Sequence, residues 1–119
     1  MIYWISKQQQ VNAPGITQIT EHEANEQLQD IKYLQVDCET TGLSHVDDTI
    51  LLVQVGNNED QYVFDVRDGD FSILQQVLTD DRIKILHNAC FDYKFLKKAG
   101  VVLNIVWDTL VIEKLLHNG

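Results

Sequence analysis

The chain of 119 residues carries 18 acidic and 9 basic residues, which gives a formal net charge of -9. This length suits one domain with a modest core, and the acidic balance excludes a broad basic surface that would hold phosphate groups unaided. No apolar window is long enough to cross a membrane, and the first ten residues lack a basic leader, so we expect a soluble cytoplasmic protein. The two cysteines, Cys38 and Cys90, form no spaced framework and are expected to be reduced thiols.

The first 31 residues are expected to form a strand, an arm and a short helix. Ile2–Ile5 has the β-branched and aromatic composition of a strand. The polar stretch 6–15, which includes the single proline, indicates a loop or arm. Thr20 and Glu23 have the spacing of a capping box, which predicts a helix to about Gln29.

Residues 32–119 are expected to form the main domain, joined to the first 31 residues in one globular unit. Three strand-like runs with a turn at 56–60 predict an antiparallel meander, and they span 32–37, 50–56 and 61–66. The chain then alternates between a helix capped by Asp70, a strand at 83–86, a helix at 88–99 capped by Asn88 and ended by Gly100, a strand at 101–106, and a helix capped by Asp108. The alternation indicates an α/β fold with a mixed five-stranded sheet flanked by helices.

Two carboxylates stand one residue apart where the run 32–37 ends, in the stretch VDCETTGL. Side chains alternate along a strand, so Asp37 and Glu39 share one face, about 7 Å apart, while Cys38 takes the other face. Like charges at that spacing repel unless water or a cation screens them, and Mg²⁺ and Mn²⁺ take oxygen ligands. From this triplet alone, a pair of exposed acids at a strand end is the commoner arrangement.

A third acid, Asp92, opens the predicted helix 88–99 in the stretch HNACFD, just beyond a strand end. The stretches DCETTGL and HNACFD, with the later VWDT, resemble the first and second motifs of the DEDD superfamily of 3′–5′ exonucleases. The runs ILLVQVGN, FDYKFLKKAGV and WDTLVIEKLL narrow the resemblance to ribonuclease D and to the proofreading domains of family A DNA polymerases. It extends over about residues 32–116 and implies a ribonuclease H-like fold.

The resemblance also implies roles for individual residues. Asp37, Glu39 and Asp92 match the catalytic acids that hold a pair of Mg²⁺ or Mn²⁺ ions. In this family one metal activates the attacking water and the other stabilises the departing 3′ oxygen, which releases nucleoside 5′-monophosphates. Positions near the terminal nucleotide are matched by Thr40, Leu43 and Asn88. For Asn88 a helix cap is an equal alternative, and the two roles can coexist.

The third motif of the family, Tyr-x-x-x-Asp or His-x-x-x-x-Asp on a later helix, has no match after Asp92. The later acids are Asp108 and Glu113, and neither has Tyr or His at the required spacing. We therefore expect an exonuclease domain that is C-terminally incomplete and weak or inactive alone. The alternative is a non-catalytic ribonuclease H-like scaffold or interaction module. The expected partners are the 3′ end of single-stranded DNA or RNA and a polymerase or a missing C-terminal segment, without a membrane partner.

Two further groups of residues have open roles. Asp108 stands between a predicted strand and a predicted helix, which favours a helix cap over a metal ligand. Lys94, Lys97 and Lys98 share a helical face that could meet phosphate groups, although such a face is more often only solvated.

Overall fold

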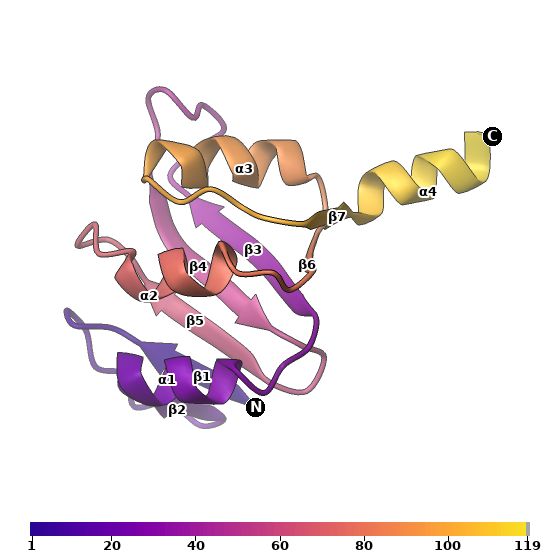
Figure 1. The fold of residues 1–119 in the computed structure, drawn as a ribbon. Coiled ribbons are helices and arrows are strands. Elements are labelled where there is room, and N and C mark those ends of the chain that lie inside the picture. Colours follow the sequence, from indigo (N-terminus) through magenta and orange to yellow (C-terminus); the bar gives the residue numbers. More distant parts are fainter. Residues whose placement is uncertain (119) are drawn as a thin grey trace.

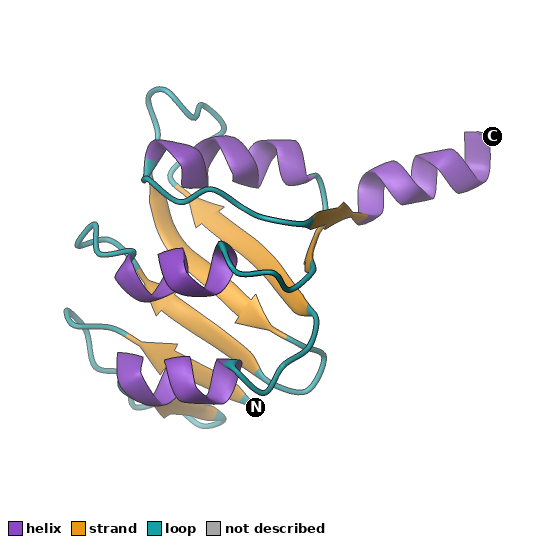
Figure 2. Ribbon diagram, in the orientation of Figure 1, coloured by secondary structure: helices purple, strands orange, loops and turns teal. Residues whose placement is uncertain are grey.

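The computed structural model describes residues 1–118, which build one mixed sheet and four helices (Figure 1). The strands and helices are β1 (Ile2–Ile5), β2 (Ile16–Gln18), α1 (Glu21–Leu28), β3 (Leu34–Thr40), β4 (Ile50–Gly56), β5 (Gln61–Asp65), α2 (Ser72–Leu78), β6 (Lys84–Leu86), α3 (Ala89–Lys98), β7 (Val106–Asp108) and α4 (Thr109–Asn118). The seven strands lie in the order β2-β1-β5-β4-β3-β6-β7. The helices α1, α2 and α3 cover one face of this sheet, and α4 extends away from it (Figure 2).

The centre of the sheet is the predicted meander. β3 pairs antiparallel with β4, and β4 pairs antiparallel with β5. The outer strands pair in parallel, with β6 beside β3 and β7 beside β6 at one side and β1 beside β5 at the other. The α/β class is therefore confirmed.

The prediction of five strands is wrong, because the described sheet has seven. Both N-terminal segments join it: β1 pairs with β5, and the three-residue β2 pairs with β1. The sequence around β2 is polar and too short to show an alternating pattern. A strand of three residues that pairs with only one neighbour is therefore hard to predict from the sequence.

The predicted strand 101–106 is also wrong in its bounds, since β7 begins only at Val106. Val101 and Leu103 are buried while Val102 is exposed, which explains the alternating pattern. The alternating pattern arises because every second side chain packs on the core. The segment 101–104 nevertheless pairs with none of the described strands. Ile105 then adopts a positive φ of 54° just before β7.

The helix boundaries show which capping predictions hold. At α1 the Thr20 hydroxyl accepts from the Glu23 N–H at 3.1 Å, and the Glu23 carboxylate accepts from the Thr20 N–H at 3.2 Å, so the capping box is confirmed. Asp70 lies one residue before the N-cap position of α2, where its carboxylate accepts from the Ser72 N–H at 3.0 Å. Gly100, with φ 88°, ends α3 as predicted.

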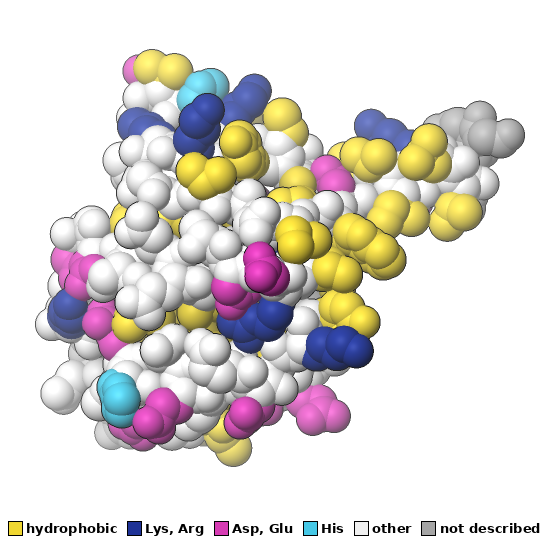
Figure 3. Space-filling model, viewed as in Figure 1, with side chains coloured by type: hydrophobic (Ala, Val, Ile, Leu, Met, Phe, Trp, Pro, Cys, Tyr) yellow, Lys and Arg dark blue, Asp and Glu magenta, His cyan; other side chains and the backbone are white. Residues whose placement is uncertain are grey.

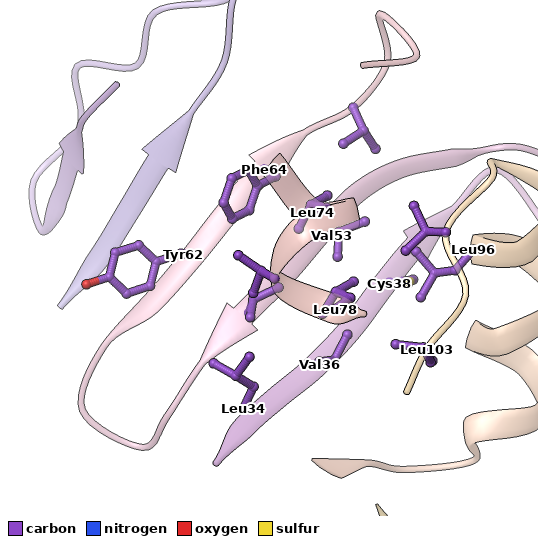
Figure 4. Packing of buried hydrophobic residues seen from close by; sticks show 14 of the residues in the cluster. Leu34, Val36, Cys38, Val53, Tyr62, Phe64, Leu74, Leu78, Leu96 and Leu103 are labelled. Atoms are coloured by element: carbon purple, nitrogen blue, oxygen red, sulfur yellow. The ribbon is translucent and has the colours of Figure 1, made fainter. Parts of the chain in front are cut away.

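The hydrophobic core lies between the helices and the sheet. Side chains of β3, β4 and β5 meet those of α2 and α3 there, and Figure 4 labels Leu34, Val36, Cys38, Val53, Phe64, Leu74, Leu78 and Leu96 among them. β3 buries Leu34, Val36 and Cys38 on this side. The alternate positions Asp37 and Glu39 therefore belong to the opposite face, which α1, α2 and α3 do not cover.

A buried acid joins the N-terminal arm to the sheet. Asp65, at the end of β5, accepts from the Ser6 hydroxyl at 2.6 Å and from the Arg67 Nε at 2.8 Å. The Arg67 guanidinium holds the pKa of Asp65 at about 2, with burial opposing this and Ser6 supporting it. The ionised carboxylate is therefore the form that the fold stabilises.

Candidate active site at the end of strand β3

β3 changes its surroundings where the two predicted acids occur. Its parallel neighbour β6 pairs only with Leu34 and Gln35, so β3 has no partner on that side from Val36 onward. On its other side the pairing with β4 shifts between Glu39 and Thr40, which marks a β-bulge. Bulges and strand ends in such sheets are common at functional sites. Asp37 and Glu39 are both exposed at this opening.

Asp92 approaches the same place from the helical layer. It lies in the first turn of α3, which follows β6, and only 3% of it is exposed. Its pKa is raised to about 7, first by burial and then by the negative charge of Asp37. The fold therefore brings Asp37 and Asp92 close enough for their charges to interact, although they are 55 positions apart in the sequence.

Cys38 lies between Asp37 and Glu39 in β3 and is close to Asp92. Its side chain is buried in the core, as the strand alternation predicted, and it lies close enough to Asp92 for the two groups to affect each other's pKa. Burial raises the pKa of the Cys38 thiol far above its ordinary value, and the charges of Asp92 and Asp37 add to this. The thiol is thus neutral and a poor metal ligand.

The side chains at this site can be compared with the ligands that the predicted metal ions require. Asp37 and Asp92 offer carboxylate oxygens, the ligands of hard divalent ions, and their repulsion would be relieved by a bound cation. Glu39 is exposed on the same face of β3 as Asp37, and its negative charge contributes to the raised pKa of Cys38. Within residues 1–118, however, no three His, Cys, Asp or Glu side chains stand close enough to enclose a metal. The carboxylate oxygens of Asp37 and Asp92 are of the kind that Mg²⁺ and Mn²⁺ prefer, but the described residues do not form a complete set of ligands.

The loop 41–49, between β3 and β4, carries the next predicted residues. The Thr40 hydroxyl donates to the Gly42 carbonyl at 2.6 Å, so it stabilises the start of this loop. A side chain at Gly42 would come within 2.5 Å of the Asp48 carboxylate, which accepts from the Ser44 N–H and the Thr41 hydroxyl. Leu43 follows with 87% of its surface exposed.

The same loop is attached to α3. Lys98 donates to the carbonyls of Val46 at 2.9 Å and Asp48 at 3.2 Å. Figure 3 shows basic and hydrophobic side chains together where the loop meets this helix. Of the three lysines with an open role, Lys98 is therefore a structural contact to the loop.

Leu43 and Asn88 come together in one pocket of about 240 Å³ between the loop and the start of α3. The other lining residues are His45, Cys90, Phe91, Lys94 and Phe95. Of these, His45 and Phe91 were not predicted as site residues, since a single histidine and a helical phenylalanine carry no distinctive pattern. Lys94 was left open, and the structure places it at this pocket.

The prediction that Asn88 caps α3 with its side chain is wrong. Asn88 occupies the N-cap position but has left-handed backbone angles of φ 61° and ψ 60°, and its side chain makes no capping hydrogen bond. Capping side chains belong to residues with extended backbone angles, which Asn88 lacks. Asp108, 20 positions later, accepts from the Asn88 N–H at 3.0 Å and the Ala89 N–H at 2.8 Å.

Asp108 also caps α4, as predicted, by accepting from the Leu110 N–H at 2.9 Å. Partial burial alone would raise the pKa of Asp108. The N–H donors of Ala89, Leu110 and Asn88 outweigh this effect and hold the pKa below its ordinary value. Because both oxygens accept backbone hydrogen bonds, Asp108 is a cap in this structure.

Comparison with known proteins identifies the family. The model of the 3′–5′ exonuclease domain matches residues 16–118, so the chain belongs to this exonuclease family. It is 35% identical over 94 residues to DNA polymerase I of Aquifex aeolicus, and the match covers 78% of the chain. The matched region is only 15% of the length of that polymerase.

Solved structures confirm the ribonuclease H-like fold of these exonucleases. NrnC of Brucella melitensis with bound Mg²⁺ superposes with a TM-score of 0.76 at 23% identity, covering 98% of this chain and 54% of that one. Ribonuclease D of Trypanosoma brucei in complex with RNA U12 gives a TM-score of 0.68 at 24% identity, covering 79% of this chain and 36% of that one. The chain thus spans about half or less of these relatives. Among the described helices, none has the length and hydropathy needed to cross a membrane.

Proposed function

We propose that this domain binds the 3′ end of a single-stranded nucleic acid with a divalent metal, as part of a 3′–5′ exonuclease. The observation that carries the proposal is the buried Asp92 carboxylate held against the charge of Asp37. A buried carboxylate beside a second negative charge costs free energy unless a cation balances the two charges. Membership of the exonuclease family supplies the kind of reaction.

The site residues divide into two groups in this proposal. Asp37, Glu39 and Asp92 hold Mg²⁺ or Mn²⁺ through their carboxylates. Bound divalent ions in such a site activate water and stabilise the leaving oxygen of a phosphodiester, which would release nucleoside 5′-monophosphates. The terminal nucleotide is placed in the neighbouring pocket, and its contacts are Leu43, Asn88 and the loop that begins at Thr40.

The relatives do not distinguish DNA from RNA as the substrate. One relative is a DNA polymerase, and one solved neighbour is a ribonuclease D in complex with RNA. The proposal therefore covers both DNA and RNA. The net charge of -9 makes bridging cations a general requirement for both.

A second candidate is a scaffold or interaction module without turnover. Within these 119 residues no Tyr-x-x-x-Asp or His-x-x-x-x-Asp pattern follows Asp92, so the fourth carboxylate that the resemblance implies is not among them. In the first candidate the fourth carboxylate and the residue that orients water must be supplied in addition to these 119 residues. Partners such as a polymerase belong to both candidates.

Metal binding is the first test. At a free Mn²⁺ concentration ten times its dissociation constant, binding should add about 1.4 kcal/mol to the free energy of unfolding and raise the melting temperature. Asp37→Asn and Asp92→Asn should each reduce this gain. Asp81→Asn, at an exposed position, is the matched control and should retain it. An unchanged melting temperature in the wild type, or equal gains in all variants, would refute the metal site.

A turnover assay tests whether these residues are catalytically sufficient. A 5′-labelled single strand is incubated with the chain and Mn²⁺, and the products are resolved by length. We expect retention of the 3′ end with little release of mononucleotides, since a missing general acid-base group typically costs about 10² to 10⁴ in rate. A strong one-nucleotide ladder that Asp37→Asn abolishes would show that these residues are already catalytically sufficient.

A further inference from the structure

Two helix starts lie together at one edge of the candidate site. β6 and β7 are parallel neighbours, and Leu86 is aligned with Asp108 in their register. Both strands end here, so α3 begins at Ala89 and α4 begins at Thr109 side by side. A change at the β7–α4 junction can therefore act directly on the first turn of α3.

The carboxylate of Asp108 connects these two helices. Its Oδ1 accepts from the N–H groups of Asn88 at 3.0 Å and Leu110 at 2.9 Å, and its Oδ2 accepts from Ala89 at 2.8 Å. The first N–H groups of a helix have no partner within the helix, and an acidic group there is favoured by the helix dipole. One side chain thus satisfies backbone donors at both helix starts.

The local sequence of α3 cannot supply this stabilisation. Asn88 is in the left-handed region, which asparagine adopts more readily than most non-glycine residues, and its side chain provides no cap. The first N–H groups of the helix therefore need an acceptor from elsewhere. Asp108 supplies it by accepting from the Asn88 and Ala89 N–H groups.

A second connection joins the same junctions. The Thr109 hydroxyl donates to the Leu86 carbonyl at 3.3 Å and lies 3.0 Å from the Nδ1 of His87. The residues immediately before α3 are therefore held to the start of α4 by both Asp108 and Thr109. The orientation of the first turn of α3 depends on these contacts.

We infer that Asp108 is a positioning residue for the metal site: by capping α3 from β7, it holds Asp92 in place beside Asp37. Asp92 lies in the first turn of α3, a few residues after the two amides that Asp108 binds. Loss of the cap would release Asn88 from its left-handed conformation and shift this turn. The inference rests on the proposed metal-binding function of Asp92.

The test compares three variants by calorimetry with Mn²⁺. Asp108→Ala should weaken Mn²⁺ binding by about 10- to 100-fold, the usual effect of removing a group that orients a metal ligand. Asp108→Asn retains one acceptor oxygen and should lose less. Asp70→Ala, which removes the equivalent bond at α2, is the matched control and should leave the affinity unchanged.

Two measurements without metal distinguish failure of this inference from failure of the proposed function. Amide exchange at Asn88 and Ala89 should accelerate at least tenfold in Asp108→Ala if these hydrogen bonds are lost. The ¹³C shift of the Asp92 carboxyl should change in the same variant and move back toward the wild-type value in Asp108→Asn. If the wild type binds no Mn²⁺, the metal proposal fails, and these two readouts still decide the role of Asp108.

Several outcomes would overturn the inference. One is protection of both amides in Asp108→Ala, and another is Mn²⁺ affinity within about twofold of the wild type. Equal losses in Asp108→Ala and Asp108→Asn would indicate that the charge of Asp108 acts directly on the metal. If Asp108→Ala does not fold, Thr109→Val removes the second connection without a change of charge, and unaltered amide exchange in that variant and in Asp108→Asn would also contradict the inference.

Discussion

At the scale of single residues, the buried carboxylate of Asp92 is unfavourable in its ionised form. Burial and the negative charge of Asp37 raise its pKa, and the neighbouring Cys38 thiol offsets only part of this rise. A carboxylate in this position favours its protonated form, so the fold is stabilised at low pH and loses that contribution as the pH rises through about 7. Under the proposed function, a bound cation would offset this cost.

We therefore predict that Asp92→Asn stabilises the metal-free protein at pH 8. A rise in pKa from 3.8 to about 7 corresponds to a cost of up to about 4 kcal/mol, which the neutral amide would avoid. Urea unfolding in the presence of a chelator measures the difference. Asp81→Asn should change little, and a less stable Asp92→Asn would contradict the prediction.

Residue patterns in the sequence were sufficient for some of the site. Alternation along β3 correctly placed Cys38 in the core, because the period of a strand is local information. The cap of α3 was missed, because its donor and acceptor are 20 positions apart and become neighbours only through the pairing of β6 with β7. Asn88 has the right residue type for a cap, but its backbone conformation is set by that distant contact.

At the scale of secondary structure elements, α3 and α4 differ in how much they contribute to the core. Leu96 of α3 is fully buried, whereas Leu115 and Leu116 of α4 are 69% and 77% exposed. Hydrophobic side chains remain visible along α4 where it extends from the body (Figure 3). Packing therefore stabilises α3 far more than α4.

The matched pair Leu96→Ala and Leu115→Ala tests this difference. The first change should destabilise the fold by about 2 to 5 kcal/mol because it leaves a cavity in the core. The second should change the free energy of unfolding by less than about 0.5 kcal/mol, as is usual for an exposed position. Both values come from chemical denaturation, and similar losses in the two variants would show that α4 is packed against the body.

At the scale of the whole molecule, the sheet joins segments that the sequence analysis separated. The division at residue 32 remains a prediction, but β1 and β2 continue the sheet beyond β5. The meander was predictable because its strands are long and consecutive. The outer strands were less so, because three-residue strands such as β2 and β7 depend on their neighbours more than on their own sequence.

The contact of Asp65 with Ser6 and Arg67 makes this junction sensitive to acid. Because the pKa of Asp65 is lowered to about 2, its stabilising contribution is complete above the ordinary pKa of 3.8 and is lost as the pH falls through 2. We predict that Asp65→Asn loses about 2 kcal/mol at pH 6 and less at pH 2. Thermal unfolding across this range measures it, and a loss that does not depend on pH would argue against the ion pair as its source.

The contrast between the two cysteines has a practical consequence. Cys38 is buried and its raised pKa keeps it as an unreactive thiol, whereas Cys90 is exposed and lines the pocket shared by Leu43 and Asn88. A thiol-selective fluorophore would therefore attach to the native chain at one place, without engineered cysteines. Under the proposed function, its emission would report when an oligonucleotide end enters the pocket and when it leaves.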